Sequence, residues 1–335
     1  MPTRQHQFIA RDSGALCNEP LFGDRLVRLM YHQVRENAPG LFRLLTSPRA
    51  TEILGYLNYD LPFGRLGSAT GRFLKELAVD LDECLASPEE LDTPRKVFER
   101  QIRYWECRPM DNDPGQAVSP ADARVLVGSC RETSSLFIKE KFFSFEELLG
   151  GDRRPWLAAF KEGDFALFRL TPDKYHYNHC PVSGEVADIY EIDGAFNSCN
   201  PSAIVTVATP YSKNRRVVTV IDTDVRGGTG VGLVALVEVV ALMIGDIVQC
   251  YSSEEYRDPT SVRPGMFLEK GQPKSLYRPG SSTDIVLFQR GRVEFAGDLV
   301  ANQKRRDAVS RFSLGFGAPL VETDIRVRAL LARAR

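Results

Sequence analysis

Three segments of the chain carry side chains that could together perform nucleophilic catalysis. Asp122 lies in "VSPADARVL", His176 and His179 lie in "KYHYNHCPVSGEV", and two serines follow Gly280 in "YRPGSSTDIVLF". A serine hydroxyl becomes a good nucleophile when a histidine takes its proton, and an acidic group can orient that histidine. The segments are about 55 and 100 residues apart, which is compatible with such a site because any chain order can assemble it.

Each segment also has a purely structural interpretation. Pro-Gly-Ser is ordinary turn chemistry before a strand, and Asp122 can bond its own backbone after a turn. His176 and His179 could be structural, catalytic or metal-binding, although Pro181 and the lack of a suitably spaced acidic or thiolate partner argue against a metal site. The segment "VRGGTGVGL" resembles a phosphate loop, but its glycines do not follow the GxGxxG spacing, so it is better interpreted as a connection between strands.

A β-rich body is expected to position these residues. Short β-branched or aromatic runs separated by turn residues predict strands, and the runs are "ARVLVG", "SSLFIKE", "DFALFRL", "SAIVTVATP", "RRVVTVIDTD", "STDIVLF" and "GRVEFAG". A short helix is predicted in "SFEELLGG", where Ser144 and Glu147 have capping-box spacing and Gly150 can end the helix.

The first hundred residues carry a different pattern. Apolar residues recur at helical spacing from Leu26 to Val34 and from Phe73 to Leu85. In "TPRKVF" a threonine N-cap followed by proline is typical of a third helix start. The predicted fold class is α+β, with a helical N-terminal region at 1–105 and a mostly antiparallel sandwich or barrel-like catalytic body at 106–335.

Composition excludes several classes of partner and compartment. With 43 basic and 44 acidic residues, a formal net charge of -1, no basic field predicts nucleic-acid binding. Seven cysteines without a CxxC argue against a disulfide framework or zinc ribbon and favour a reducing, cytoplasmic compartment. The N-terminus lacks the apolar core of a signal peptide. The apolar stretch "VGLVALVEVVALMIGDIV" contains Glu238 and Asp246 and predicts buried strands rather than a membrane span.

Five segments resemble, in order and approximate spacing, the motifs of the phosphatidylserine decarboxylase family. They are "VSPADARVL", "FIKEKFFSFEELLGG", "FRLTPDKYHYNHCPVSGEV", "VALVEVVALMIGDI" and "EKGQPKSLYRPGSSTDIVLF", within roughly residues 106–300. The resemblance implies a pyruvoyl enzyme made by self-cleavage, in which a serine attacks the preceding carbonyl and elimination leaves a pyruvoyl group on the downstream chain. That group serves as the covalent cofactor, because its carbonyl forms a Schiff base with the substrate amine and accepts electrons as CO₂ departs.

The same resemblance implies roles for individual residues. Asp122 would orient His179, and His179 would activate the serine. His176 would serve proton transfer or substrate positioning. At Pro273 and Ser275 the chain departs from the family's usual Glu and Gly, while the catalytic residue types are retained.

Two registers are open for the cleavage site. Counting back from Phe288 makes Ser282 the pyruvoyl precursor and Ser281–Ser282 the scissile bond, which gives chains 1–281 and 282–335. The rival register cuts Gly280–Ser281. We favour Ser282 because its position matches the motif's serine, with a threonine directly after it.

The implied reaction is the conversion of phosphatidylserine into phosphatidylethanolamine and CO₂. A soluble pyruvoyl decarboxylase of a free amino acid, such as tryptophan, is the alternative, and a non-catalytic binding homologue is a third interpretation. The N-terminal helices could lie peripherally on a bilayer, although an apolar helix face is more often core. The expected partners are the phospholipid or amino-acid substrate and the chain's own cleaved halves, and a homo-oligomer remains open.

Overall fold

The computed structural model describes residues 5–21, 24, 37, 38, 40, 79–130, 142–206, 209–241, 246–280 and 282–335. The helical patterns predicted between Leu26 and Leu85 therefore lie outside the described residues, except for the last few, which include the short 3-10 helix η3 (Leu81–Glu83). The predicted strand "SSLFIKE" and Ser281 also lie outside them.

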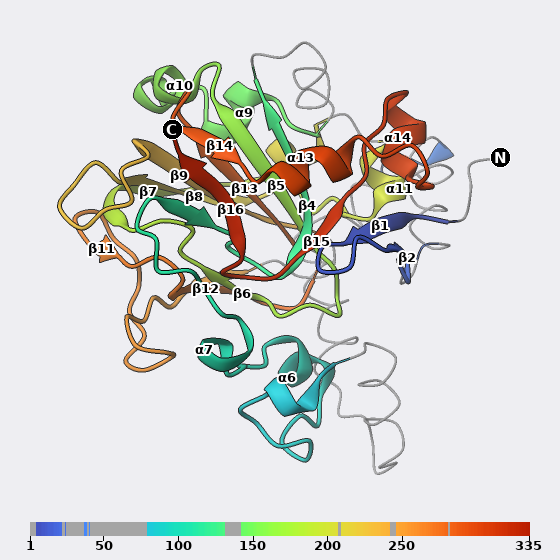
Figure 1. Cartoon of the computed structure of the whole chain (residues 1–335), viewed down its shortest axis with the longest axis horizontal. Coiled ribbons are helices and arrows are strands. Elements are labelled where there is room, and N and C mark those ends of the chain that lie inside the picture. The colour runs from blue at the N-terminus through green and yellow to red at the C-terminus, as the bar shows by residue number, and fades with distance from the viewer. Residues whose placement is uncertain are drawn as a thin grey trace.

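A ten-stranded sheet forms the centre of the molecule (Figure 1), in the order β11-β7-β8-β9-β13-β5-β4-β15-β1-β2. Among the described strands of this sheet, only β1 and β15 pair in parallel. Its strands are β1 (Gln7–Ala10), β2 (Leu16–Asn18), β4 (Ala123–Ser129), β5 (Asp164–Leu170), β7 (Gly184–Ile192), β8 (Arg216–Asp222), β9 (Leu233–Val240), β11 (Phe267–Leu268), β13 (Ser282–Phe288) and β15 (Thr323–Ile325).

Two three-stranded sheets pack against one face of the large sheet. Their strands are β10 (Ile247–Gln249), β12 (Pro273–Tyr277) and β6 (Tyr177–His179) in the first, and β14 (Val293–Phe295), β16 (Leu330–Ala334) and β3 (Gln116–Val118) in the second. Apolar side chains from both small sheets and from the large sheet form one buried cluster between them. None of the described sheets closes into a barrel. The predicted α+β class with an antiparallel sandwich is therefore confirmed, and the barrel-like variant is not adopted.

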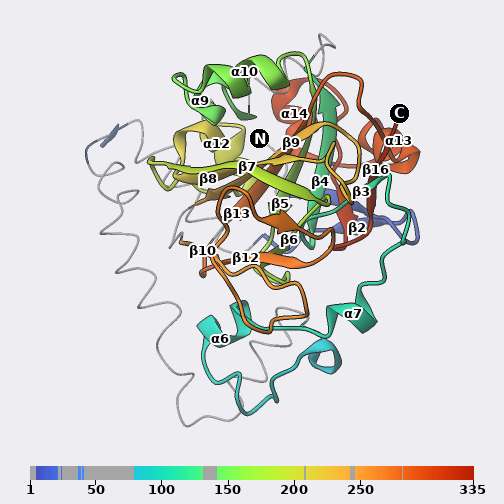
Figure 2. The same ribbon diagram turned by 90° about the vertical axis from the view of Figure 1, so that its left-hand side faces the viewer.

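Short helices cover the opposite face of the large sheet, where a second apolar cluster lies. They are α9 (Phe145–Leu149), α10 (Arg154–Phe160), α11 (Pro201–Ile204), α12 (Pro210–Lys213) and α14 (Arg311–Phe316), while α13 (Gly297–Gln303) contacts β4 and β15. The helices α6 (Pro94–Phe98) and α7 (Tyr104–Cys107) lie below the β10-β12-β6 sheet (Figure 2). Within the described part of the chain, no helix has the length and apolar composition needed to cross a bilayer.

The alternation of side chains along β13 decides which residues can meet the histidines. Ile285 and Leu287 pack in the cluster under the helices, whereas Val286 and Phe288 pack in the cluster that includes the small sheets. Because side chains alternate between the two faces of a strand, Ser282 shares the face of Val286 and Phe288. Ser282 therefore faces the layer that contains β6 and β12.

The predicted local signals act largely as expected. Thr93 caps α6 by accepting from the backbone N–H of Lys96 at 3.2 Å. Ser144 caps α9 by accepting from the backbone N–H of Glu147 at 3.4 Å, and Gly150 ends that helix with a φ of +90°. The glycine-rich segment joins β8 to β9, so its interpretation as a connection between strands is confirmed.

Two predictions differ from the structure. The run "SAIVTVATP" was expected to be a strand, but it contributes to helices α11 and α12. Asn200 accepts from the backbone N–H of Ser202 and Pro201 occupies the first turn, and this cap favours a helix over the β-branched composition. The expected helical character of residues 1–105 does not extend to β1 and β2, which join the large sheet.

Candidate active site

Ser282 begins β13 and lies deep in the sandwich. It pairs with Leu170 of β5 on one side and with Val240 of β9 on the other, and it is 1% exposed. Its hydroxyl has no hydrogen-bond partner among the described residues. A buried hydroxyl without a partner is costly and calls for a functional explanation. The preceding residue in the chain, Ser281, is outside the described residues, while Gly280 has a φ of +152°.

His179 lies on β6, the strand that pairs with β12, and His176 directly precedes this strand. His179 opposes Pro273 in the β6-β12 register, and the backbone N–H of Tyr277 donates to the carbonyl of His176 at 3.1 Å. Because His179 is on a strand and not a helix, the helical HxxH metal interpretation does not apply. The strand β12, which precedes Ser282 in the chain, therefore lies beside the segment that contains both histidines.

Both ring nitrogens of His179 have fixed partners. Nδ1 lies 2.8 Å from the carbonyl oxygen of Gly271, and Nε2 lies 2.9 Å from the hydroxyl of Tyr175. A carbonyl can only accept, so Nδ1 carries the proton and Nε2 presents a lone pair to Tyr175. Burial lowers the pKa of His179 to about 3, so the ring is a neutral base at physiological pH.

His176 is held by stacking rather than by hydrogen bonds. Its ring stacks on Phe98 with the centroids 3.5 Å apart. Neither ring nitrogen forms a hydrogen bond of ordinary geometry with a described residue. Burial lowers the pKa of His176 to about 3. As far as the described residues go, this fully buried, neutral imidazole can therefore offer its nitrogens to a ligand or a moving proton.

The hydrogen-bond partners of Asp122 differ from His179, the partner that the family resemblance implies. Arg108 donates to both of its carboxylate oxygens, and the backbone N–H of Val327 donates to Oδ1 at 2.7 Å. Burial opposes ionisation, but Arg108 lowers the pKa of Asp122 below its ordinary value. No direct hydrogen bond joins Asp122 to His179, whose two nitrogens bond Gly271 and Tyr175.

The Asp122 carboxylate nevertheless acts on the histidines through space. Its charge favours the protonated form of both His176 and His179, against the larger effect of burial. The loop before Asp122 is also fixed to the site, because the backbone N–H of His179 donates to the carbonyl of Pro120 at 2.7 Å. The structure therefore brings the aspartate and the histidines into one buried region.

Two acidic residues near the site were not predicted from the sequence. Glu238 and Asp284 face each other across β9 and β13, and both are fully buried. Glu238 interrupts the otherwise apolar strand "LVALVEVV", and Asp284 stands directly before the apolar run that ends "STDIVLF". That interruption was the available signal, since a buried strand rarely contains an acid without a partner or a function.

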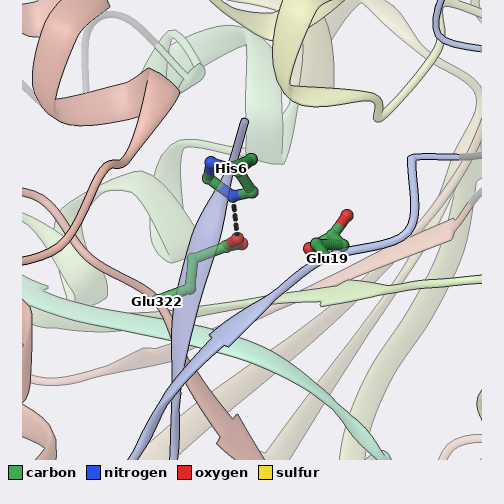
Figure 3. A group of neighbouring side chains, drawn as sticks. All are labelled: His6, Glu19 and Glu322. Carbon is green, nitrogen blue, oxygen red and sulfur yellow. Dashed lines mark hydrogen bonds and ion pairs between the residues drawn. The ribbon is translucent and has the colours of Figure 1, made fainter. Parts of the chain in front are cut away.

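A second polar cluster includes Arg169, which is paired with Thr283 and faces the side of the large sheet opposite to Ser282, and it is interpreted as structural. Side-chain atoms of His6, Glu19 and Glu322 lie within 4.8 Å of one another (Figure 3). Arg169 donates to Glu19 at 2.6 Å and to Glu322 at 2.5 Å. Because this guanidinium already supplies the positive charge that a metal ion would bring, the cluster is explained as an ion network that fixes the terminal strands.

A surface hollow of about 600 Å³ lies at the other end of the sheet. It is lined by Arg226 of the β8-β9 connection and by Phe267 of β11, among others. Ser282 pairs with Val240, the last residue of β9, whereas the β8-β9 connection adjoins the first. This part of the hollow is therefore at the opposite end of β9 from Ser282.

Comparison with known proteins shows the family of the chain. Residues 95–312 match the family described as phosphatidylserine decarboxylase. The chain is 25% identical over 301 residues to a phosphatidylserine decarboxylase proenzyme of Fusobacterium nucleatum, and this match covers 90% of this chain and 93% of the relative. It is 32% identical over 236 residues to a Bordetella petrii protein of the same name, covering 67% and 78% of the two chains. A Pseudomonas fluorescens relative with that name is 31% identical over 242 residues, covering 69% and 82%. On the extent of these matches, this chain belongs to the phosphatidylserine decarboxylase family.

Proposed function

We propose that this protein is a self-processing carboxy-lyase that converts phosphatidylserine into phosphatidylethanolamine and CO₂. The names of its relatives, which include the word proenzyme, support both the reaction and the processing. The observation that carries the proposal to this chain is the buried Ser282 hydroxyl, which has no hydrogen-bond partner in the part of the chain that the structure describes. A serine with a purely structural role would be expected to satisfy its hydroxyl in such a place.

In the proposed cleavage, Oγ of Ser282 attacks the carbonyl carbon of Ser281 and the peptide C–N bond breaks, which leaves an ester and a free amine. Loss of the Ser282 α-proton then breaks the Cβ–Oγ bond and releases Ser281 as a new C-terminal carboxylate. Tautomerisation and hydrolysis by one water molecule release ammonia and leave a pyruvoyl group at position 282. In the rival register the same steps begin at Ser281 and cut the bond to Gly280.

His179 is the proposed base for the first proton transfer. Its Nε2 lone pair is the correct acceptor, because Nδ1 already donates to the Gly271 carbonyl. That lone pair faces the Tyr175 hydroxyl. Either His179 breaks this hydrogen bond and accepts the serine proton directly, or Tyr175 passes its own proton to His179 and takes the serine proton in its place. Asp122 is proposed to favour the protonated ring by its charge, and His176 to move a proton or position the substrate.

The position of residue 282 fits a pyruvoyl group. The group is small, and the site offers a buried strand end whose hydroxyl has no competing partner among the residues that are described. When present, this group supplies an electron sink for decarboxylation of a bound amine. The Tyr277 hydroxyl lies 3.0 Å from the carbonyl oxygen of Thr283 and accepts from the Val239 backbone N–H at 3.0 Å. These bonds hold the start of the downstream chain in place after cleavage.

Both cleaved chains are expected to stay in one body. The downstream chain would begin with β13, which remains paired with β5 and β9 of the upstream chain. A lipid substrate also implies peripheral contact with a bilayer, and residues 1–105 are the proposed location of that contact. These are parts of the proposal that a lipid-binding assay of the full chain can test.

The substrate is tested by measuring CO₂ release from the purified, cleaved protein. Phosphatidylserine vesicles are expected to give CO₂ and phosphatidylethanolamine, whereas free tryptophan and other amino acids give neither. Ser282→Ala is the matched control, because it lacks only the hydroxyl from which the cofactor would form. CO₂ from a free amino acid alone would replace the lipid with that substrate, and an inactive, intact wild-type chain would support the non-catalytic interpretation.

A further inference from the structure

Two fully buried carboxyl groups lie side by side on the face of the large sheet that Ser282 shares. Asp284 of β13 is paired with Glu238 of β9, and both residues are 0% exposed. Like charges held this close in a buried site cannot both ionise without a large cost in free energy. The surrounding donors therefore decide which of the two carboxyls is charged.

Glu238 receives nearly all of the available donors. The Lys274 ammonium lies 2.7 Å from Oε2, and the Gln249 side-chain amide donates to the same oxygen at 3.1 Å. Ser275 and Asn178 donate to Oε1. A carboxylate with a cation and three further donors is stabilised in its charged form.

Asp284 has a much poorer set of partners. The Tyr277 hydroxyl donates to Oδ1 at 2.7 Å, while Oδ2 has no hydrogen-bond partner among the described residues. The residue that opposes Asp284 on the β5 side is the apolar Phe168. Burial, and next the charge of Glu238, raise the pKa of Asp284 well above its ordinary value. Asp284 is thus a neutral carboxylic acid with an available proton.

This acid lies close to the place where the reaction is proposed to occur. Asp284 is two residues after Ser282 and points to the same face of β13, so their Cα atoms are about 7 Å apart at the usual rise of a strand. Both side chains are buried, and each has a polar atom for which the described residues provide no partner. A group bound at residue 282 could therefore contact Oδ2 of Asp284.

We propose that Asp284 is the acid of this site and that it donates its proton to the substrate carbon that loses CO₂. The inference rests on the proposed function. Breaking the bond to the carboxylate leaves an electron pair on that carbon, and the proton from Oδ2 forms the new C–H bond. Asp284 is left as a carboxylate, and one proton from water restores it for the next turnover.

The charges at the site agree with this assignment. His176, the other candidate, is a neutral imidazole because burial lowers its pKa to about 3, so it holds no excess proton near neutral pH. An ionised Asp284 would repel the substrate carboxylate, whereas the neutral acid does not. The charged groups beside Asp284 are Glu238 and Lys274. Because Lys274 pairs with Glu238 at 2.7 Å, its charge does not stabilise an ionised Asp284, which therefore keeps its proton.

The test is Asp284→Asn in the full chain, which keeps the shape and removes the proton. The variant is expected to cleave to completion by intact mass, and to release CO₂ from phosphatidylserine about 100-fold more slowly with KM little changed. The matched control is Asp164→Asn, the same change in another buried aspartate. Asp164 begins β5, whereas Ser282 pairs with Leu170 at the other end of that strand. That control is expected to keep the wild-type rate.

A second measurement does not depend on the folding of the variant. Infrared spectra of the wild-type protein with and without ¹³C-labelled aspartate, at about pH 8, are expected to show a protonated aspartic acid, because this pH exceeds the ordinary aspartate pKa by about four units. A missing acid band, uncleaved Asp284→Asn, or a cleaved Asp284→Asn that keeps the full rate would each overturn the inference while leaving the proposed function standing. A wild-type protein that neither cleaves nor releases CO₂ would instead overturn the proposed function itself, and this inference with it.

Discussion

The Tyr175 hydroxyl lies 2.9 Å from Nε2 of His179 and occupies the lone pair that a base would use. The same hydroxyl lies 2.8 Å from the hydroxyl of Tyr256, which in turn bonds the backbone of Ile102. This chain of contacts connects the buried histidine to the segment between α6 and α7. It fixes the tautomer and the orientation of His179 before any reaction begins.

Removing this hydroxyl should destabilise the fold. Tyr175→Phe leaves Nε2 of His179 as a buried acceptor without a donor, which costs about 1–3 kcal/mol in the free energy of unfolding. Urea denaturation of the Ser282→Ala background measures this loss on an uncleaved chain. Tyr177→Phe is the control, because the bond that the described residues give the Tyr177 hydroxyl is a 3.2 Å bond accepted from the partly buried Gln101. Equal losses for the two variants would contradict the role given to Tyr175.

The two buried histidines predict a loss of stability in weak acid. Their folded pKa values are lowered to about 3 by burial, while an unfolded histidine titrates near 6.5. The unfolded chain therefore takes up protons first as pH falls through about 6.5, and each histidine lowers the unfolding free energy by up to about 1.4 kcal/mol per pH unit below that value. The stabilising effect is fully present above pH 6.5.

Urea denaturation at about pH 7.5 and about pH 5.5 checks this dependence in the Ser282→Ala background. His176→Phe, which keeps an aromatic ring against Phe98, should show a smaller drop between the two conditions. An identical drop in both proteins would mean that His176 does not stay neutral in the folded chain.

The buried ion pair between Lys274 and Glu238 predicts a strongly context-dependent substitution. Both side chains are 0% exposed, so Lys274→Met leaves a buried carboxylate without its cation and should cost about 3–5 kcal/mol of unfolding free energy. Adding Glu238→Gln should recover much of that loss, because the unpaired charge is gone. The control is Lys96→Met at the exposed pair with Asp92, where at most about 1 kcal/mol is expected. Denaturant curves that rank Lys96 equal to Lys274 would disagree with the structure.

Asp122 should matter less for cleavage than His179 does. The ring of His179 is oriented by Gly271 and Tyr175, so Asp122→Asn leaves both of these bonds in place. For His179 the substitution removes a charge that raises its basicity, an effect of about tenfold if it changes the pKa by one unit. His179→Ala removes the base and should slow cleavage by at least about 100-fold. Timed gel analysis of freshly synthesised chains compares the two rates. A loss as large for Asp122→Asn as for His179→Ala would favour a direct aspartate–histidine contact during the reaction.

Much of the β-rich body could be predicted because local residue patterns indicate its strands. The runs at β4, β5, β8, β13 and β14 are β-branched or aromatic and are bounded by turn residues. The run at 202–210 was misassigned because Asn200 and Pro201 form a helix cap that outweighs β propensity. The strands β1 and β2 were missed because β1 gains its place through pairing with β15, more than 300 residues away.

The candidate site was predictable in its residue types but not in its pairings. Asp122, His179 and Ser282 lie in recognisable segments, whereas the partners of Asp122 and His179 are set by distant chain segments. Arg108 reaches Asp122 from α7, and Asp284 meets Glu238 only through the register of β9 and β13. Such contacts depend on tertiary packing, which local sequence patterns do not encode.

The central claim is that the chain cuts itself before Ser282, and intact-mass spectrometry of the purified protein tests it most directly. The proposal predicts two species in place of the 37.5 kDa chain. The smaller should hold the 54 residues from Ser282 to Arg335, since 335 minus 281 is 54, and should have the mass of a pyruvoyl group in place of its first serine. Ser282→Ala should remain one intact chain. A wild-type protein that stays uncleaved would contradict the account, and a smaller species of 55 residues would move the cut to Gly280–Ser281.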